Sequence, residues 1–322
     1  MKENTMKLQC PIPRILLPVD GSKHAKRAVQ FAGRLGASMG KSLSGITLLH
    51  ILTGGYLSRH MANIDFRTKI IEESEIFKRI KEQHINQDIK PFLDESEKLL
   101  RDAGVEASIE RLIRDGDASN EVIRTADEGN FSAVMMARRG LSELKGLFLG
   151  SVTSKIIHAA TRQTIYIVGD KISKDKAFPI PKILIPVDGS SYSMNGVEHI
   201  ACLTAPLKES LDKITLLRVI NMALYMERLK SGTDPEGEAQ QILNDAKTVF
   251  LNAGFAQNLI ETKVAIGKPA EEILKEADQG EVNLIVMGRK GRTALKDIMI
   301  GGVSSTVLQR SINPTIALVR SS

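Results

Sequence analysis

The sequence carries the same motif twice, about one domain length apart. The residues PVDGS occupy positions 18–22 and again 186–190, each time directly after a run of apolar residues. A repeat of this length indicates two homologous folds in tandem. A site in one half should therefore have a counterpart in the other half.

A second pair of motifs comes late in each copy. ARRG at 137–140 and LGSVT at 149–153 correspond to GRKG at 288–291 and IGGVS at 300–304. Because both pairs keep their order, the repeat extends over most of each half. The places where the copies differ then indicate which half has kept its chemistry.

Composition limits the classes of protein to consider. The 322 residues fit two domains of ordinary size, and 42% hydrophobic with 25% charged residues is typical of a soluble globular protein. The net charge of +6 is spread along the chain, which favours a solvated surface over a nucleic-acid site. Aromatic residues make up only 4%, with no Trp, which argues against stacking platforms for single strands.

The chain lacks the signals of secretion and membrane insertion. Residues 1–13 have no apolar core for a signal peptide, and no run approaches the roughly 20 apolar residues that span a bilayer. Cys10 and Cys202 lie at non-equivalent places in the two copies, which argues against a disulfide framework and a cysteine zinc site. We expect a cytoplasmic protein with no membrane partner.

Apolar runs predict five strands in each half, with helices between them. The predicted strands are 14–19, 44–52, 106–114, 131–137 and 164–168, then 182–187, 213–220, 259–266, 283–287 and 315–319. Alternating strands and helices, with strands apolar throughout, predict an α/β fold with a parallel sheet covered on both faces. We therefore expect two tandem doubly wound five-stranded domains, at 12–170 and 181–320, joined by a linker at 171–181.

The halves differ most between the second and third strands. The PVDGS motifs lie 168 positions apart but Gly150 and Gly301 only 151, so the first half carries 17 extra residues, within about 54–91. Ile70, Ile71 and Phe77 keep helical spacing among many charges, which predicts a long amphipathic helix. The pattern fits packing over its own domain and, equally, a lid or a partner-binding element.

The repeated motifs fall where open α/β sheets bind ligands, outside the carboxyl ends of the strands. Asp20 and Asp188 end the first strand of each half, and the late glycines lead into helices that begin near Val152 and Val303. Glycines let backbone N–H groups approach a ligand, and a helix N-terminus adds partial positive charge. The arrangement suits phosphate, although glycine and serine before a helix are also ordinary turn and cap residues.

The combined motifs resemble the universal stress protein family over almost the whole chain. They are the strand ending in PVDGS, the second strand ending in LLH at 48–50, and the late Gly-x-x-Gly motif followed, after a gap of nine residues, by Gly-Ser or Gly-Gly. The resemblance implies a five-stranded parallel fold and a role in the stress response. It further implies ATP or AMP binding in members that keep the glycine pattern, with Mg²⁺ as a further possibility.

The resemblance carries site residues over by position. In the second half the matching residues are Pro186, Val187, Asp188, Val219, Met287, Gly288, Gly291, Gly301, Gly302, Val303 and Ser304. In the first half they are Asp20, Ile51, Gly140, Gly150, Ser151 and Thr153. The two acids, with Ile51 and Val219, match residues on the adenine side of the ligand, and the glycines and hydroxyls match those at its phosphates.

Neither half keeps the family pattern in full. Ala137 replaces the first glycine of the loop, where we expect its Cβ to obstruct the ribose or to strain the backbone. Gly302 replaces a Ser or Thr, which removes one hydroxyl but leaves the N–H. We therefore expect the second half to be the better nucleotide site. Arg289, with Lys290, Arg292 and Lys296, either helps to neutralise phosphates or is a solvated loop charge.

Two other functions stay open. One is an ATP hydrolase or phosphotransferase, although one acid at the adenine end is badly placed to act on the γ-phosphate, and no catalytic residue is assigned. The other is a nucleotide-free scaffold with degenerate loops. Three common motifs do not occur: H-E-x-x-H of metalloproteases, G-x-S-x-G of serine hydrolases, and G-x-x-x-x-G-K-[ST] of the Walker phosphate-binding loop. The resemblance also implies that the strands at 164–168 and 315–319 pair between the halves, leaving homodimerisation possible.

Overall fold

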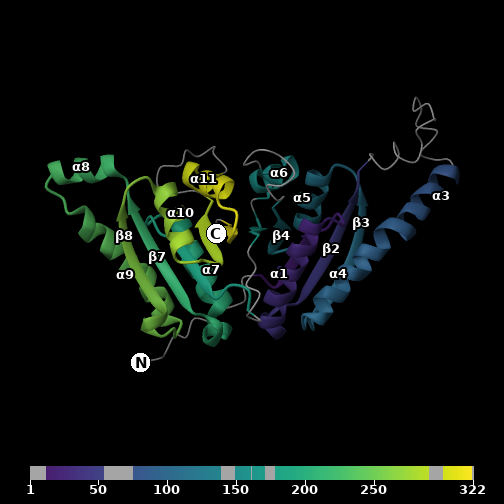
Figure 1. Cartoon of the computed structure of the whole chain (residues 1–322), viewed down its shortest axis with the longest axis horizontal. Helices are drawn as coiled ribbons and strands as arrows, with labels where there is room; N and C mark the ends of the chain where they lie inside the picture. The colour runs from purple at the N-terminus through teal and green to yellow at the C-terminus, as the bar shows by residue number, and fades with distance from the viewer. Residues whose placement is uncertain are drawn as a thin grey trace.

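A computed structural model describes residues 12–53, 75–138, 149–160, 162–170, 178–289 and 300–320. The two halves of the chain lie side by side, each a sheet with helices on both faces (Figure 1). The inner strands form from buried apolar runs, because helices cover the sheet on both faces. Ile15, Leu16 and Leu17, for example, are completely buried.

The first half follows the predicted order of elements. Its described elements are β1 (Arg14–Pro18), α1 (Lys23–Met39), β2 (Gly45–Leu52), α3 (Glu75–His84), α4 (Lys90–Asp102), β3 (Ser108–Asp115), α5 (Ala118–Glu128), β4 (Ala133–Ala137), α6 (Ser151–Ala159) and β5 (Thr164–Val168). A π-helical turn, Ile85–Ile89, joins α3 to α4. A short 3-10 segment, Gly40–Ser42, precedes β2.

The second half repeats the order. Its described elements are β6 (Lys182–Pro186), α7 (Ser191–Thr204), β7 (Lys213–Ile220), α8 (Met222–Lys230), α9 (Pro235–Asn252), β8 (Ile260–Ile266), α10 (Pro269–Gln279), β9 (Leu284–Gly288), α11 (Gly302–Arg310) and β10 (Thr315–Val319). Two 3-10 segments, Ala205–Ser210 and Gln257–Leu259, lead into β7 and β8.

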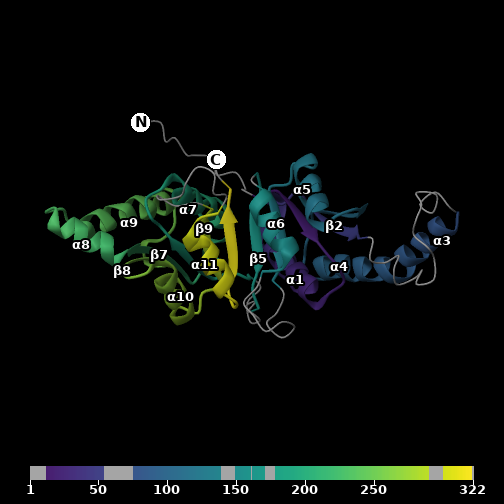
Figure 2. The same ribbon diagram turned by 90° about the horizontal axis from the view of Figure 1, so that it is seen from above.

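The ten strands form one continuous sheet in the order β3-β2-β1-β4-β5-β10-β9-β6-β7-β8. Strands are parallel within each half, and the halves meet where β5 and β10 pair antiparallel, with Tyr166 opposite Ala317. Figure 2 shows these two strands side by side at the centre of the molecule. The predicted fold and the pairing of the last strands are both confirmed.

Two helix layers cover the sheet. Helices α1, α4, α7 and α9 pack over one face, and α5, α6, α10 and α11 over the other. Each layer buries one apolar cluster that contains residues from both halves. The hydrophobic core therefore runs across the junction between the halves, and burial of apolar surface stabilises their pairing.

The segment between β2 and β3 is only partly as predicted. The helix predicted within 54–91 corresponds to α3 from Glu75 onward, while 54–74 lies outside the described residues. Helix α4 was not predicted, although Leu93 and Leu100 are buried at helical spacing. Helix α8 was not predicted either.

The predicted linker is described only at its end. Residues 171–177 lie outside the described residues, and Phe178 and Ile180 are buried in the cluster that both halves share on the α1 and α7 face. Within the described parts of the chain, no helix has the length and apolarity that a bilayer crossing requires.

Candidate functional site

The PVDGS turn has the same structure in both halves. Gly21 and Gly189 adopt φ values of +74° and +80°, which glycine adopts without strain. The serine then begins the helix: Ser22 Oγ accepts from the N–H of Ala25, and Ser190 Oγ from that of Ser193. The motif is therefore a strand-to-helix turn with its own N-cap.

The acid of the motif organises this turn. Asp188 Oδ1 accepts from the backbone N–H of Ser190 at 2.9 Å and from its hydroxyl at 2.5 Å. Asp20 Oδ1 accepts from the N–H of Ser22 at 3.0 Å. Asp188 is half-buried while Asp20 is exposed, so the second half holds its acid in the more enclosed setting.

An apolar wall lies beside Asp188 at the carboxyl edge of the sheet. Val219 and Met287 form this wall: both are buried, with exposed fractions of 7% or less, in the cluster under α10 and α11. Val187 is also buried but in the cluster on the α7 face, and Pro186 is half-buried at the end of β6. Ile51, the counterpart of Val219, is half-buried against the cluster that contains Val219.

Helix α11 begins without a side-chain cap. Its N-cap is Gly301, and a Cβ added at Gly302 would meet nothing within 4 Å. The first backbone N–H groups of such a helix lack intrahelical partners, and the helix dipole favours an anion there. Val303, in the first turn, is 37% exposed. Ser304 is buried and donates its hydroxyl to the carbonyl of Gly288 at 2.9 Å, which fastens α11 to the end of β9.

The first half has an equivalent helix start. Gly150 is the N-cap of α6 and makes no side-chain capping bond. Ser151 is exposed and Thr153 is half-buried. The predicted loop glycines Gly140 and Gly291 lie outside the described residues.

The backbone strain expected at Ala137 is absent, whereas the expected obstruction of a ribose stays a prediction. At its counterpart Gly288, a Cβ would lie 2.5 Å from the carbonyl oxygen of Tyr192, on the side of α7 and away from α11. The Ala137 side chain correspondingly packs against the cluster on the α1 face. Among the described residues other than glycine, only Asn130 and Glu281 have positive φ, so Ala137 is not strained in this way.

Arg289 is not placed as a phosphate ligand. Its guanidinium is buried and crosses to the first half, where it donates to the carbonyls of Ile157 at 2.8 Å and Gln163 at 2.9 Å. Arg138, the counterpart, crosses in the opposite direction to Leu308 at 2.8 Å. These crossings were not predicted, although the arginine occurs at the same place in ARRG and GRKG. Lys290, Arg292 and Lys296 lie outside the described residues.

His50 is structural, as the sequence indicated. Its Nδ1 donates to the carbonyl of Val19 at 2.8 Å, and its ring packs edge-on against Phe92. Burial lowers the pKa of His50, although the bond to Val19 and the charge of Asp20 act in the opposite direction. The imidazole therefore has a packing role on the α4 side of the sheet.

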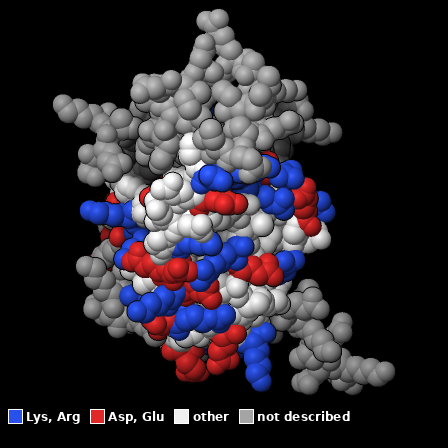
Figure 3. Space-filling view, turned by 90° about the vertical axis from the view of Figure 1, so that its right-hand side faces the viewer, with Lys and Arg blue, Asp and Glu red and all other residues white. Residues whose placement is uncertain are grey.

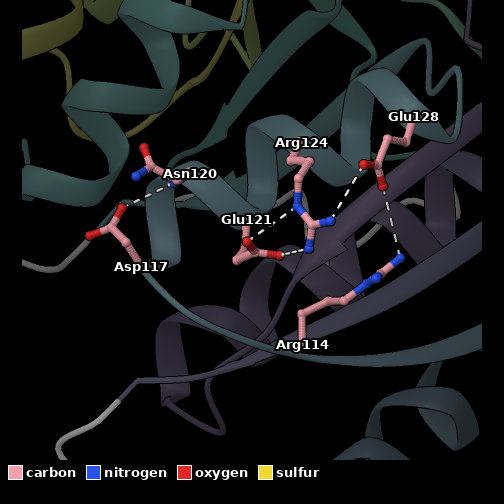
Figure 4. Close-up of polar contacts among 6 residues, drawn as sticks. All are labelled: Arg114, Asp117, Asn120, Glu121, Arg124 and Glu128. Atoms are coloured by element: carbon pink, nitrogen blue, oxygen red, sulfur yellow. Dashed lines mark hydrogen bonds and ion pairs between the residues drawn. The ribbon is translucent and has the colours of Figure 1, made fainter.

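The acidic side chains that follow β3 are engaged in structural contacts. Asp117 caps α5, and its pKa is lowered mainly by the hydrogen bond from the Ser119 hydroxyl. Arg124 pairs with Glu121 and Glu128, and Glu128 also lies 4.0 Å from Arg114 (Figure 4). Within the described ranges, no group of three or more His, Cys, Asp or Glu side chains is arranged to hold a metal ion.

Charge on the outer face of the first half is mixed. Figure 3 shows Lys and Arg interspersed with Asp and Glu on this face. The printed ion pairs here include Arg111 with Asp94 and Glu97, and Lys81 with Asp115. This face therefore lacks the one-sign stripe typical of nucleic-acid binding.

Comparison with known proteins identifies the family. The sequence model of the universal stress protein family matches residues 11–165 and again 179–318. The chain belongs to the universal stress protein family. Both matches include the PVDGS turn and the late glycines, so the chain is a tandem universal stress protein.

Some relatives match almost the whole chain, and others match about one half of it. A universal stress protein of Mycolicibacterium smegmatis is 25% identical over 317 residues, covering 94% of this chain and 96% of the relative. Universal stress protein MJ0577 of Methanocaldococcus jannaschii is 32% identical over 159 residues, covering 43% of this chain and 94% of the relative. The crystal structure of a universal stress protein from Archaeoglobus fulgidus covers 96% of both chains with a TM-score of 0.66 at 19% identity, which shows the shared fold.

Proposed function

We propose that this tandem universal stress protein binds an adenine nucleotide, ATP or AMP, in its second half, and responds to it as a regulatory module. The observation that carries the proposal is the start of α11, where a glycine N-cap, an open position at Gly302 and a buried apolar wall lie at one edge of the sheet. Phosphate suits the uncapped N–H groups, and a planar base suits the apolar residues.

The proposal gives each residue a role. Backbone N–H groups of Gly302 and Val303 donate to phosphate oxygens, and Val219 and Met287 contact the adenine. Asp188 binds on the adenine side, as the family resemblance implies. Ser304 holds the helix start in place through its bond to the carbonyl of Gly288. We leave Mg²⁺ out, because no described acidic cluster is arranged to hold it.

We propose the second half as the tighter site for a physical reason other than the one the sequence suggested. Asp188 and Val219 are more enclosed than Asp20 and Ile51, and polar contacts strengthen where water is excluded. The first half, with its own glycine N-cap and the Ser151 hydroxyl, is a weaker second site. The domain limits 12–170 and 181–320 remain our proposal for the two binding units.

A matched pair of charge substitutions tests which half binds. Val303→Asp and Val152→Asp place a carboxylate at the same position of α11 and of α6, where both valines are exposed. An acid in the first turn favours the helix, so both variants should fold. We expect Val303→Asp to weaken ATP and AMP binding in calorimetry at least tenfold. Val152→Asp should leave the tight site unchanged.

The uncharged Val303→Asn variant is the control for the loss of the valine. If only Val152→Asp lost binding, the tight site would lie in the first half. If purified protein releases no nucleotide on heating, and ATP gives no binding heat in any variant, the scaffold function replaces nucleotide binding. ATP turnover abolished by Gly291→Val would instead favour the hydrolase.

A further inference from the structure

Each half has one buried arginine whose side chain contacts the other half. Arg138 and Arg289 each follow the fourth strand of their half, and their exposed fractions are 5% and 4%. Each guanidinium reaches backbone carbonyls at the C-terminal end of the last helix of the other half. Arg289 donates to the carbonyl oxygens of Ile157 in α6 and of Gln163 just beyond it. Arg138 donates to the carbonyl oxygens of Leu308 and Gln309 in α11 and of Ser311 just beyond it.

These contacts stabilise charges that are otherwise expensive to bury. No carboxylate of the described residues lies within ion-pair distance of either guanidinium, so the helix C-terminal carbonyls supply the partial negative charge. Burial lowers the pKa of Arg289 to about 10, which still leaves it protonated at neutral pH. Burial also lowers the pKa of Arg138, while the charge of Asp170 acts in the opposite direction. Breaking these hydrogen bonds would leave buried guanidinium and carbonyl groups without partners, which is costly. Each arginine therefore holds the two halves together strongly.

The backbone of Arg289, which a side-chain substitution keeps, also contacts the start of α11 in its own half. Its backbone carbonyl accepts from the N–H of Gly301, the N-cap of α11, at 2.6 Å. One residue therefore contacts the start of α11 through its backbone and the end of α6 through its side chain. Helix α6 in turn begins at Ser151, in the equivalent site of the first half.

The two helices are not packed tightly against each other. A partly open groove of about 180 Å³ lies between α6 and α11, with Leu149, Ile157, Ile300 and Leu308 among its lining residues. The arginines therefore connect two helices that have little direct contact with each other.

We propose that Arg289 transmits nucleotide binding in the second half to helix α6 of the first half. Anion binding at Gly301 and Gly302 stabilises the helix start and the carbonyl of Arg289 that holds it. The guanidinium then stabilises the end of α6, and with it the surface that α6 presents. Because linkage is reciprocal, a partner that prefers the stabilised α6 raises nucleotide affinity by the same factor.

Hydrogen exchange with ATP as the probe tests this connection. We expect ATP to slow exchange of the backbone amides of 156–160 about fivefold or more, the low end of allosteric coupling factors. In Arg289→Met, ATP should still bind and protect 300–305, but protection of 156–160 should be lost. Arg138→Met is the matched control, because its contacts are with α11, so ATP should still protect 156–160.

Arg289→Lys covers the case in which the methionine variant does not fold. Its single ammonium cannot hold both carbonyls in the geometry of the guanidinium, so protection of 156–160 should fall while binding persists. The inference rests on the proposed function, and the two fail differently. Binding heat without protection of 156–160 in the wild type, or protection that persists in the Arg289 variants, overturns the connection alone. Absence of ATP binding in every protein overturns both.

Discussion

At the scale of single residues, one hydroxyl distinguishes the two helix starts. Ser151 begins α6, while Gly302 begins α11 with open space where a side chain would be. The glycine keeps its N–H but offers no hydroxyl to a bound phosphate. A serine at position 302 would give the second half the hydroxyl of the first without changing a core residue.

We expect Gly302→Ser to strengthen ATP binding in the second half by roughly two- to tenfold, as one added hydrogen bond of about 0.5–1.5 kcal/mol predicts. Calorimetric titration measures the change. Gly302→Ala is the control, since it adds the Cβ without the hydroxyl. An affinity equal to that of the alanine variant would show that the phosphate does not lie at this position.

At the scale of elements, strand β9 and helix α7 approach so closely that only glycine fits between them. A Cβ at Gly288 would lie 2.5 Å from the carbonyl oxygen of Tyr192. The first half accommodates Ala137 at the equivalent place, packed against the core on the α1 face. The halves therefore share a topology but differ in how closely the first helix packs on the fourth strand.

Gly288→Ala should destabilise the protein by about 1–3 kcal/mol, the usual cost of overpacking. Ala137→Gly, the reverse change at the equivalent position, should cost no more than about 1 kcal/mol, since it removes one methyl and loosens the strand. Urea unfolding compares the two variants. Equal losses would contradict the difference in packing between the halves.

The elements themselves were largely predictable from sequence. All ten strands lie close to where they were predicted. The inner strands are apolar because both their faces are buried, whereas the edge strands β3 and β8 are mostly half-buried or exposed and carry polar residues. Helix α4 was missed despite the spacing of Leu93 and Leu100, which is a helical signal. Helix α8 was also missed, although Met222, Met226 and Leu229 keep helical spacing; these three side chains are about half exposed.

At the scale of the whole molecule, the two halves are locked together by asymmetric contacts. Tyr166 in β5 hydrogen-bonds to the Nε2 of His199 in α7 at 2.7 Å, and both residues are buried. The tyrosine also packs near Phe31 of its own half, at the position equivalent to His199. The backbone at Gly169 packs directly on Asn313 and Pro314.

Gly169→Ala should weaken the pairing of the halves. Its Cβ would lie 2.2 Å from the carbonyl oxygen of Asn313, so β5 and β10 would have to separate at that end. We expect a loss of about 1–3 kcal/mol or more in the unfolding free energy, measured in urea. Gly302→Ala, with nothing near its new methyl, is the control. Equal stability of the two variants would contradict the close approach.

His199 should make stability sensitive to acid. Burial lowers its pKa to about 3, with the charge of Arg320 acting in the same direction. The unfolded chain takes up this proton near pH 6.5, so it binds more protons than the folded chain between pH 3 and 6.5. The unfolding free energy should therefore fall as pH drops below about 6.5, by up to about 1.4 kcal/mol per pH unit.

The variant His199→Phe, which copies Phe31 of the first half, isolates this effect. Urea unfolding between pH 7 and pH 5 should show a shallower pH dependence in the variant than in the wild type. The variant also loses the bond to Tyr166, which lowers its stability at every pH without changing the slope. Identical slopes would show that His199 is not held neutral in the folded protein.

The sequence by itself determined the repeat, the strands, the PVDGS turn and the uncapped glycine helix starts. All of these depend on residues close together in the chain, where apolar spacing and turn residues act directly. The tertiary structure decided the direction of the Ala137 side chain, the burial of His199 and the crossing of the arginines. Arg289 and its acceptors are separated by 126 and 132 residues, and Arg138 and Leu308 by 170. No local pattern specifies such contacts, because they form only when β5 and β10 join the halves.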